Sequence, residues 1–175
     1  MRAALLVTAA IAIAGIGLVA QGRGGAEARI KERQIVLPEL PKPVGNYVEA
    51  VRIGNLLYLS GHGPDESWRG KGQVGREVTV EQGRTAARSA GLRMLSTIRG
   101  ALGSLDRVER VVKVFGMVNS APGFAEQPKV IDGFSDLMTE VFGDVAGKGT
   151  RSAVGMSALP FGIPVEVEMI LEVRD

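Results

Sequence analysis

The sequence RSAVGMSALPFGIPVEVEMILEV, residues 151–173, contains the segment that decides the fold. After Pro164 the side chains alternate strictly between two kinds, which is typical of a β-strand with one face in the core. One set of positions is apolar and predicts the buried face: Val165, Val167, Met169, Leu171 and Val173. The other set forms either a solvated face or a face covered by a second subunit: Glu166, Glu168, Ile170 and Glu172. If it is covered, each carboxylate needs a partner because burying an unpaired charge is costly, and Arg151 is a candidate.

Working outward from this strand, the periodicity of apolar residues predicts the other elements. A capping box of Thr79 and Gln82 predicts the start of a helix that Gly103 ends, and Pro128 and Gly143 bracket a second helix. The β-rich runs predict strands over residues 47–53, 56–60, 108–118, 152–159 and 165–173. The order β-β-α-β-α-β-β indicates an α+β protein, with one mixed β-sheet covered by two helices on one face.

The composition limits the chemistry that is available. The 175 residues include no cysteine and one histidine, and the formal net charge is +2. Disulfides, thiolate nucleophiles, zinc fingers and a multi-histidine metal site are therefore excluded. We expect no cofactor and no metal, so that chemistry must come from carboxylates, arginines, hydroxyls, backbone groups and water. The small net charge does not favour nucleic acid as a partner.

The chain begins with a targeting segment. Residues 3–20 are apolar or glycine except for Thr8, and Ala26-Glu27-Ala28 fits a small-x-small cleavage site, with Ala20 as a second candidate. Residues 1–28 are interpreted as a signal peptide or, if uncleaved, as a membrane anchor. Either interpretation predicts a periplasmic or secreted protein, with contact to a membrane only if the segment is retained. Residues 29–46, which contain three prolines, predict an extended lead-in to a domain over 47–175.

Three segments resemble the RidA (YjgF-like) enamine/imine deaminase family: VGNYVEAVRIGNLLYLSGHGP at 44–64, RVVKVFGMVNS at 110–120, and the quoted segment 151–173. The last is specific, with an Arg-Ser opening, a Leu-Pro pair and an alternating Val-Glu strand. The resemblance implies a chorismate-mutase-like (RidA-like) fold. It also implies a homotrimer with ligand clefts between adjacent subunits, which would cover the carboxylate face.

The same resemblance implies the residues of the site. Arg151 would bind the carboxylate of a 2-imino acid, since a guanidinium grips a carboxylate with two hydrogen bonds. Glu166 would position and polarise the attacking water, unless Glu168 takes its place. The substrate-binding contacts would be Tyr47, Ser60 and the backbone of Ala153. The implied reaction hydrolyses a small 2-imino acid to a 2-keto acid and ammonia, without a cofactor.

The sequence also departs from the family pattern. His62 stands where many members have glutamine, and a family asparagine aligns to either Ile131 or Asp132. These departures leave open a second hypothesis, in which the trimer binds a small carboxylate metabolite without turnover. A ribonuclease is a third and weaker hypothesis. The arginines of the first long helix are interpreted as a solvated face rather than a nucleic acid contact: Arg84, Arg88, Arg93 and Arg99.

Overall fold

The structure is a computed structural model, in which the described residues are 24–65, 68 and 70–175. The apolar stretch expected to be a signal or an anchor lies outside these residues. Within the part of the chain that the structure describes, none of the helices has the length and apolar character needed to cross a membrane.

Five strands form one sheet in the order β1-β2-β5-β3-β4. Their bounds are β1 Ala50–Ile53, β2 Leu56–His62, β3 Val108–Asn119, β4 Thr150–Met156 and β5 Val165–Val173. Strands β3 and β4 are parallel and the other neighbours are antiparallel, so the sheet is mixed, as predicted. The turn between β1 and β2 uses Gly54 at φ 60°, a conformation that glycine adopts without strain.

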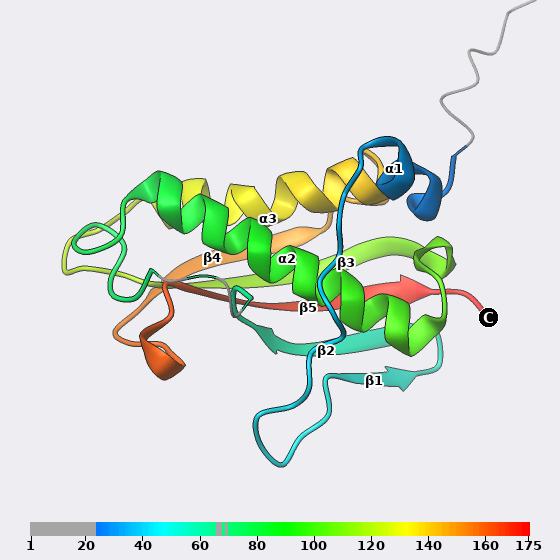
Figure 1. Ribbon diagram of the computed structural model, residues 1–175, viewed down its shortest axis with the longest axis horizontal. Coiled ribbons are helices and arrows are strands. Elements are labelled where there is room, and N and C mark those ends of the chain that lie inside the picture. The colour runs from blue at the N-terminus through cyan, green and yellow to red at the C-terminus, as the bar shows by residue number, and fades with distance from the viewer. Residues whose placement is uncertain (1–23, 66–67, 69) are drawn as a thin grey trace, which may run out of the picture.

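Two long helices, α2 (Val80–Leu102) and α3 (Gln127–Phe142), cover one face of this sheet (Figure 1). The predicted capping box is present, because the Thr79 hydroxyl accepts from the Gln82 amide and the Gln82 side chain accepts from the Thr79 amide. Gly133 lets the helices approach closely, since a Cβ there would lie 2.0 Å from the Arg84 carbonyl oxygen. The prediction of two helices on one face of a mixed sheet is confirmed.

The core lies between the helices and the sheet. The predicted apolar face of β5 is buried along its whole length, and Glu166, Glu168 and Glu172 point to the opposite face. Two predicted strands differ in extent. The strand predicted over 152–159 ends at Met156, because residues 160–162 form a short 3-10 helix, η2 (Pro160–Gly162). The strand predicted from residue 47 begins at Ala50, so Tyr47 precedes it.

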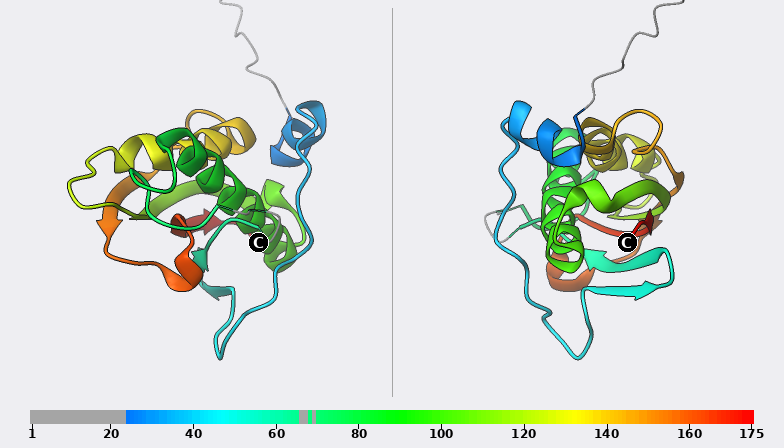
Figure 2. Two further views of the ribbon diagram at one scale, coloured as in Figure 1. Left: turned by 60° about the vertical axis from the view of Figure 1, so that its left-hand side comes forward. Right: turned by 90° about the vertical axis from the view of Figure 1, so that its right-hand side faces the viewer.

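A helix that the sequence does not predict, α1 (Ala26–Glu32), packs beside the other two (Figure 2). Ala26 and Ile30 are buried, and the Glu27 carboxylate accepts hydrogen bonds from Arg99 at 3.0 and 2.6 Å and from the Leu105 amide at 3.0 Å. The expectation of an extended chain from residue 29 is therefore wrong for residues 29–32. Beyond α1 the chain runs without helix or strand to β1.

Candidate functional site

A cavity of about 800 Å³ opens at the end of the sheet where β2 and β5 meet the loops. Its walls come from the segment before β1, from β2 and the loop after it, from α2, and from η2 with the start of β5. Three residues expected at the site line this cavity: Tyr47, Ser60 and Glu166. The structure thus brings together three of the five predicted site residues within one chain.

Glu166 lies on the sheet face away from the helices, opposite Met117 of β3. Burial raises the pKa of its carboxyl above the usual range, and the nearby charge of Glu168 raises it further. The carboxyl packs directly on Gly61, where a Cβ would lie 1.9 Å from Oε1. Glycine at this position is therefore what leaves room for the carboxyl in the cavity wall.

Ser60 and Tyr47 border the same space with different constraints. The Ser60 hydroxyl donates its hydrogen to the Val48 carbonyl oxygen at 2.7 Å. It can therefore act toward a ligand only as a hydrogen-bond acceptor. Tyr47 is 43% exposed and is reached by the Val44 amide, which donates to its hydroxyl at 3.5 Å. Its ring is consequently available as an apolar wall.

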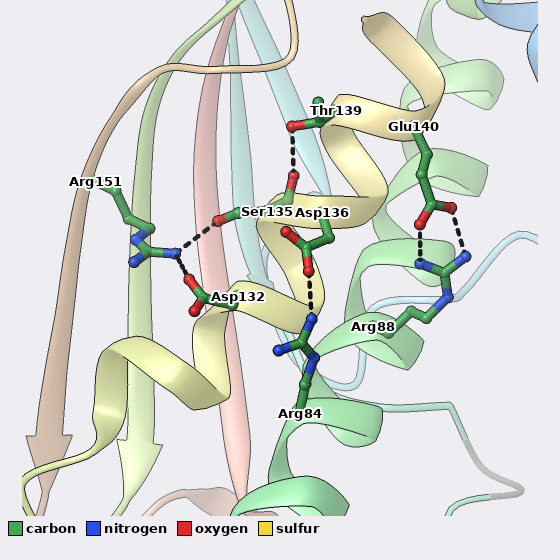
Figure 3. Close-up of polar contacts among 8 residues, drawn as sticks. All are labelled: Arg84, Arg88, Asp132, Ser135, Asp136, Thr139, Glu140 and Arg151. Carbon is green, nitrogen blue, oxygen red and sulfur yellow. Dashed lines mark hydrogen bonds and ion pairs between the residues drawn. The ribbon is translucent and has the colours of Figure 1, made fainter. Parts of the chain in front are cut away.

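Arg151 lies elsewhere, at the edge of the sheet beside α3 (Figure 3). Its Nη1 donates to Asp132 Oδ1 at 2.7 Å and to Ser135 Oγ at 3.0 Å. The register pairs Arg151 with Val114 and pairs Glu166 with Met117, and positions three apart on β3 face opposite sides of a sheet. A single chain therefore does not bring Arg151 and Glu166 to one site.

The other residues of this edge follow from the same geometry. Ala153 is two residues from Arg151 and shares its face, and β4 pairs only with β3 in the five-stranded sheet, so the backbone of Ala153 lies in an edge strand. Of the two positions that could match the family asparagine, Ile131 is fully buried against Gly116, whereas Asp132 contacts Arg151. Of the two positions, Asp132 is therefore the one that contacts a predicted site residue.

Glu49 and Arg93 are among the charged residues of the cavity that sequence reasoning missed. Arg93 donates to the carbonyl oxygens of Gly63 at 3.4 Å and Pro64 at 3.1 Å, so it is not part of a solvated face. Burial raises the pKa of Glu49, and the charge of Arg93 opposes that shift. No local sequence pattern predicts that these two residues line the cavity, because their position in its wall depends on how the loop after β2 folds back.

The remaining arginines of α2 make ion pairs rather than a purely solvated surface (Figure 3). Arg84 pairs with Asp136 at 2.5 Å, and Arg88 makes two hydrogen bonds to Glu140 at 3.0 and 2.7 Å. These contacts tie α2 to α3. Within the described ranges, no cluster of three or more histidine, aspartate or glutamate side chains is arranged to hold a metal ion.

Comparison with known proteins agrees with this architecture. Residues 27–171 match the family described as "YjgF/chorismate_mutase-like, putative endoribonuclease", and the chain belongs to that family. The predicted chorismate-mutase-like fold is thereby confirmed.

Individual relatives cover most of the chain. It is 43% identical over 162 residues to Protein TCP17 of Trypanosoma cruzi, covering 91% of this chain and 100% of that protein. It is 29% identical over 148 residues to a 2-iminobutanoate/2-iminopropanoate deaminase of Dermatophagoides farinae, covering 82% and 98%. The crystal structure of Atu1372, a protein of unknown function from Agrobacterium tumefaciens, is similar with a TM-score of 0.75 and 40% identity, covering 85% of this chain and 91% of that one.

Proposed function

We propose that the protein is an exported enamine/imine deaminase that hydrolyses small 2-imino acids to 2-keto acids and ammonia. The observation that carries the proposal is the carboxyl of Glu166, half-buried in the wall of a roomy cavity beside Tyr47 and Ser60. A carboxylate placed in this way can orient a water and accept its proton. The deaminase name of the Dermatophagoides farinae relative supports the choice of reaction.

The complete site, in this proposal, forms between two subunits of a homotrimer. Arg151 and Glu166 lie on opposite faces of one sheet, so one chain alone cannot present both to a small substrate. Arg151 lies at the sheet edge formed by β4, where a neighbouring copy can dock. We therefore propose that Arg151 and Ala153 of one subunit complete the cavity that holds Glu166, Tyr47 and Ser60 of the next.

The chemistry then follows from the contacts of each group. Asp132 and Ser135 hold Nη1 of Arg151, which leaves Nε and Nη2 to bind the substrate carboxylate. Glu166 takes a proton from water as the water oxygen attacks the imine carbon, and the carbinolamine collapses to the 2-keto acid and ammonia. Because small imines also hydrolyse in plain water, the protein contributes mainly orientation and charge stabilisation.

The decisive experiment measures ammonia release from 2-iminopropionate, generated in place by an amino acid oxidase. The wild-type protein should accelerate release above the rate in buffer, and Arg151→Ala should abolish the acceleration. Arg84→Ala is the matched control, because Arg84 also pairs with an aspartate of α3 but lies away from β4. An Arg151→Ala protein as active as the wild type would contradict the proposed site.

Export is a separate part of the proposal. Because Ala26 and Glu27 are docked in the fold, cleavage after Ala28 would cut a packed helix, and this favours removal of the leader before α1. The test is the mass of the N-terminal peptide in protein recovered from the periplasm. Protein found only in the cytoplasm would contradict export, whereas a mature chain that begins at Arg29 would contradict only the position of the cleavage.

The endoribonuclease in the family description is not the function proposed. The cavity is lined by four carboxylates, those of Glu49, Asp65, Glu166 and Glu168. Its three cationic side chains are those of Lys42, Lys71 and Arg93. The lining therefore lacks the excess of cationic side chains on which binding to a phosphate backbone depends, and this favours a small substrate over RNA.

A further inference from the structure

Glu49 lies directly before β1, and its carboxyl faces the cavity with no hydrogen-bond partner among the described residues. Its carbonyl oxygen accepts from the Ser60 amide at 3.0 Å, which extends the β1–β2 ladder by one residue and fixes the backbone. The side chain is 14% exposed, and its Oε2 lies 3.6 Å from Nε2 of His62. A fixed and nearly buried carboxyl at the wall of a cavity needs a chemical explanation.

The contacts of His62 define which proton the imidazole carries. Its Nδ1 lies 2.7 Å from the Ser60 carbonyl oxygen, which can only accept, so Nδ1 carries the hydrogen. Burial lowers the pKa of His62 and outweighs the opposing effect of the Ser60 carbonyl, so it favours the neutral ring. The Nε2 atom therefore bears a lone pair, which accepts from the Thr97 hydroxyl at 2.8 Å.

Nε2 of His62 lies 3.6 Å from the carboxyl of Glu49, beyond hydrogen-bond distance, and its lone pair is already used by the Thr97 hydroxyl. A neutral ring nitrogen without a hydrogen offers a carboxylate neither a positive charge nor a donor, so His62 does not stabilise the charged form of Glu49. Burial of Glu49 disfavours the charged form. Burial without a compensating contact from His62 therefore favours a carboxyl that keeps its proton.

We propose that Glu49 is a second catalytic group, a protonated carboxyl held beside the neutral imidazole of His62, which passes its proton to the imine nitrogen of the substrate. This inference rests on the proposed function. His62 and Thr97 are positioning residues, because they act on the substrate only through Glu49.

Two carboxyl groups, those of Glu49 and Glu166, account for every proton that moves in the reaction. In the first step the water oxygen bonds to the imine carbon, and Glu166 takes a proton from the water. The electron pair of the C=N bond moves to nitrogen, which takes the proton of Glu49. In the second step Glu49 takes the hydroxyl proton of the carbinolamine, and the C–N bond breaks as nitrogen takes the proton of Glu166. Ammonia leaves, and both carboxyl groups return to their starting states.

The charged groups around Glu49 set the pH range in which it can donate its proton. Arg93 of α2 favours the carboxylate of Glu49, and it also disfavours a second proton on His62. The other titratable groups around the cavity come from the segment before β1, the loop after β2, and β5: Lys42, Tyr47, Asp65, Lys71, Glu166 and Glu168. The acid function of Glu49 is lost as the pH rises through its elevated pKa, which produces an alkaline fall in rate.

The kinetic test compares the wild type with Glu49→Gln at several pH values. We expect kcat for 2-iminopropionate to fall by at least about 100-fold, and the alkaline fall to disappear from the residual rate. His62→Gln presents an amide N–H to Glu49 and favours its carboxylate, so the alkaline fall should move to lower pH. Glu172→Gln is the matched control, since Glu172 is on β5 but does not line the cavity.

A second measurement does not depend on turnover. His62 is the single histidine of the chain, so nitrogen NMR of the histidine-labelled protein gives one unambiguous pair of ring signals. We expect a protonated Nδ1 and an unprotonated Nε2 at neutral pH. An imidazolium, or a proton on Nε2, would overturn the arrangement of the pair.

The outcomes separate the two proposals. A folded Glu49→Gln protein with kcat within about threefold of an active wild type overturns this inference alone. A wild-type protein that hydrolyses no imine overturns the proposed function, and the catalytic role of Glu49 falls with it. Should Glu49→Gln fail to fold, Glu49→Asp retains the acid and is expected to keep an alkaline fall in rate.

Discussion

Arg151 donates from Nη1 to Oδ1 of Asp132 at 2.7 Å, across the gap between β4 and α3. The pair is partly solvated, with side-chain exposures of 27% and 41%, so its contribution to stability is small, about 0.2–1 kcal/mol. Its main effect is on Arg151 itself, because it orients the guanidinium and cancels part of its charge. The same contact would therefore tune the affinity for an anionic substrate.

Replacing Asp132 with asparagine should separate these two effects. The amide oxygen of Asp132→Asn can still accept from Arg151, but the negative charge is gone, so a substrate carboxylate is held more strongly. We expect KM for 2-iminopropionate to fall by about two- to fivefold, in line with the energy of an exposed ion pair. Steady-state kinetics measure this, with Asp136→Asn as the control, because Asp136 pairs with Arg84 instead. A rise in KM would show that orientation outweighs charge.

Replacing Glu166 with glutamine should distinguish an enzyme from a binding protein. Glu166→Gln removes the group proposed to take the proton from water, but leaves Arg151 and the cavity shape intact. We expect kcat to fall by at least about 100-fold. The Kd for the 2-keto acid product, measured by calorimetry, should change little, and Glu172→Gln should change neither quantity. A wild-type protein that binds the keto acid but releases no ammonia would support the metabolite-binding hypothesis.

The raised pKa of Glu166 should appear in the pH dependence of the rate. In the proposed mechanism Glu166 acts as a carboxylate, so activity should be lost as the pH falls through its pKa, and burial moves this loss to higher pH than for an ordinary glutamate. Glu168→Gln removes the smaller, repulsive cause and should move the acid limb to lower pH without abolishing its elevation. The limb is read from kcat/KM between mildly acidic and neutral pH. An unchanged limb in Glu168→Gln would contradict the electrostatic coupling.

The contacts of α1 should contribute to stability. Burial raises the pKa of Glu27, but the hydrogen bonds from Arg99 and the Leu105 amide outweigh it and hold the pKa below its usual range. Such a lowered pKa stabilises the fold above the pKa of the unfolded chain, and the contribution is lost as the pH falls through the folded value. Because the pair is about one-third exposed, we expect Glu27→Gln to cost about 1 kcal/mol, or a Tm decrease of about 2–4 °C at neutral pH.

Thermal melts at neutral and acidic pH test this prediction. The difference between the wild type and Glu27→Gln should narrow at the acidic pH, where the carboxylate is protonated in both states. Glu126→Gln serves as the control, since its ion pair with Lys129 is on the surface within one turn of α3. An equal Tm for Glu27→Gln and the wild type would show that the charge of Glu27 does not contribute to the stability of α1.

The sequence was sufficient for the elements whose signals are local. The alternation of Val165 to Val173 predicts both the strand and its buried face, and the capping box at Thr79 predicts where α2 begins. Helix α1 has no such signal. It has seven residues, its N-cap Gly25 has no side chain with which to cap it, and it is held by contacts with distant residues such as Arg99 and Asp106.

The candidate site was predictable only where a motif carried it. The Arg-Ser and Val-Glu motifs make Arg151 and Glu166 candidates through the family resemblance. That the two residues lie on opposite faces follows from the pairing of three strands, β3, β4 and β5. Glu49 and Arg93 could not be found in this way. Their proximity to His62 depends on the bulge between Leu59 and His62 and on the loop that follows, which no local pattern specifies.

The close packing of Gly61 on Glu166 makes the site vulnerable to a chemically mild change. A methyl group at residue 61 would occupy the space of the Glu166 carboxyl, without altering any charge or any core residue. In the proposed deaminase, alanine at residue 61 would therefore displace the Glu166 carboxyl from its place in the cavity wall and lower the rate, while the scaffold remains in place. The identity of residue 61 would then separate a catalytic chain from one that only binds.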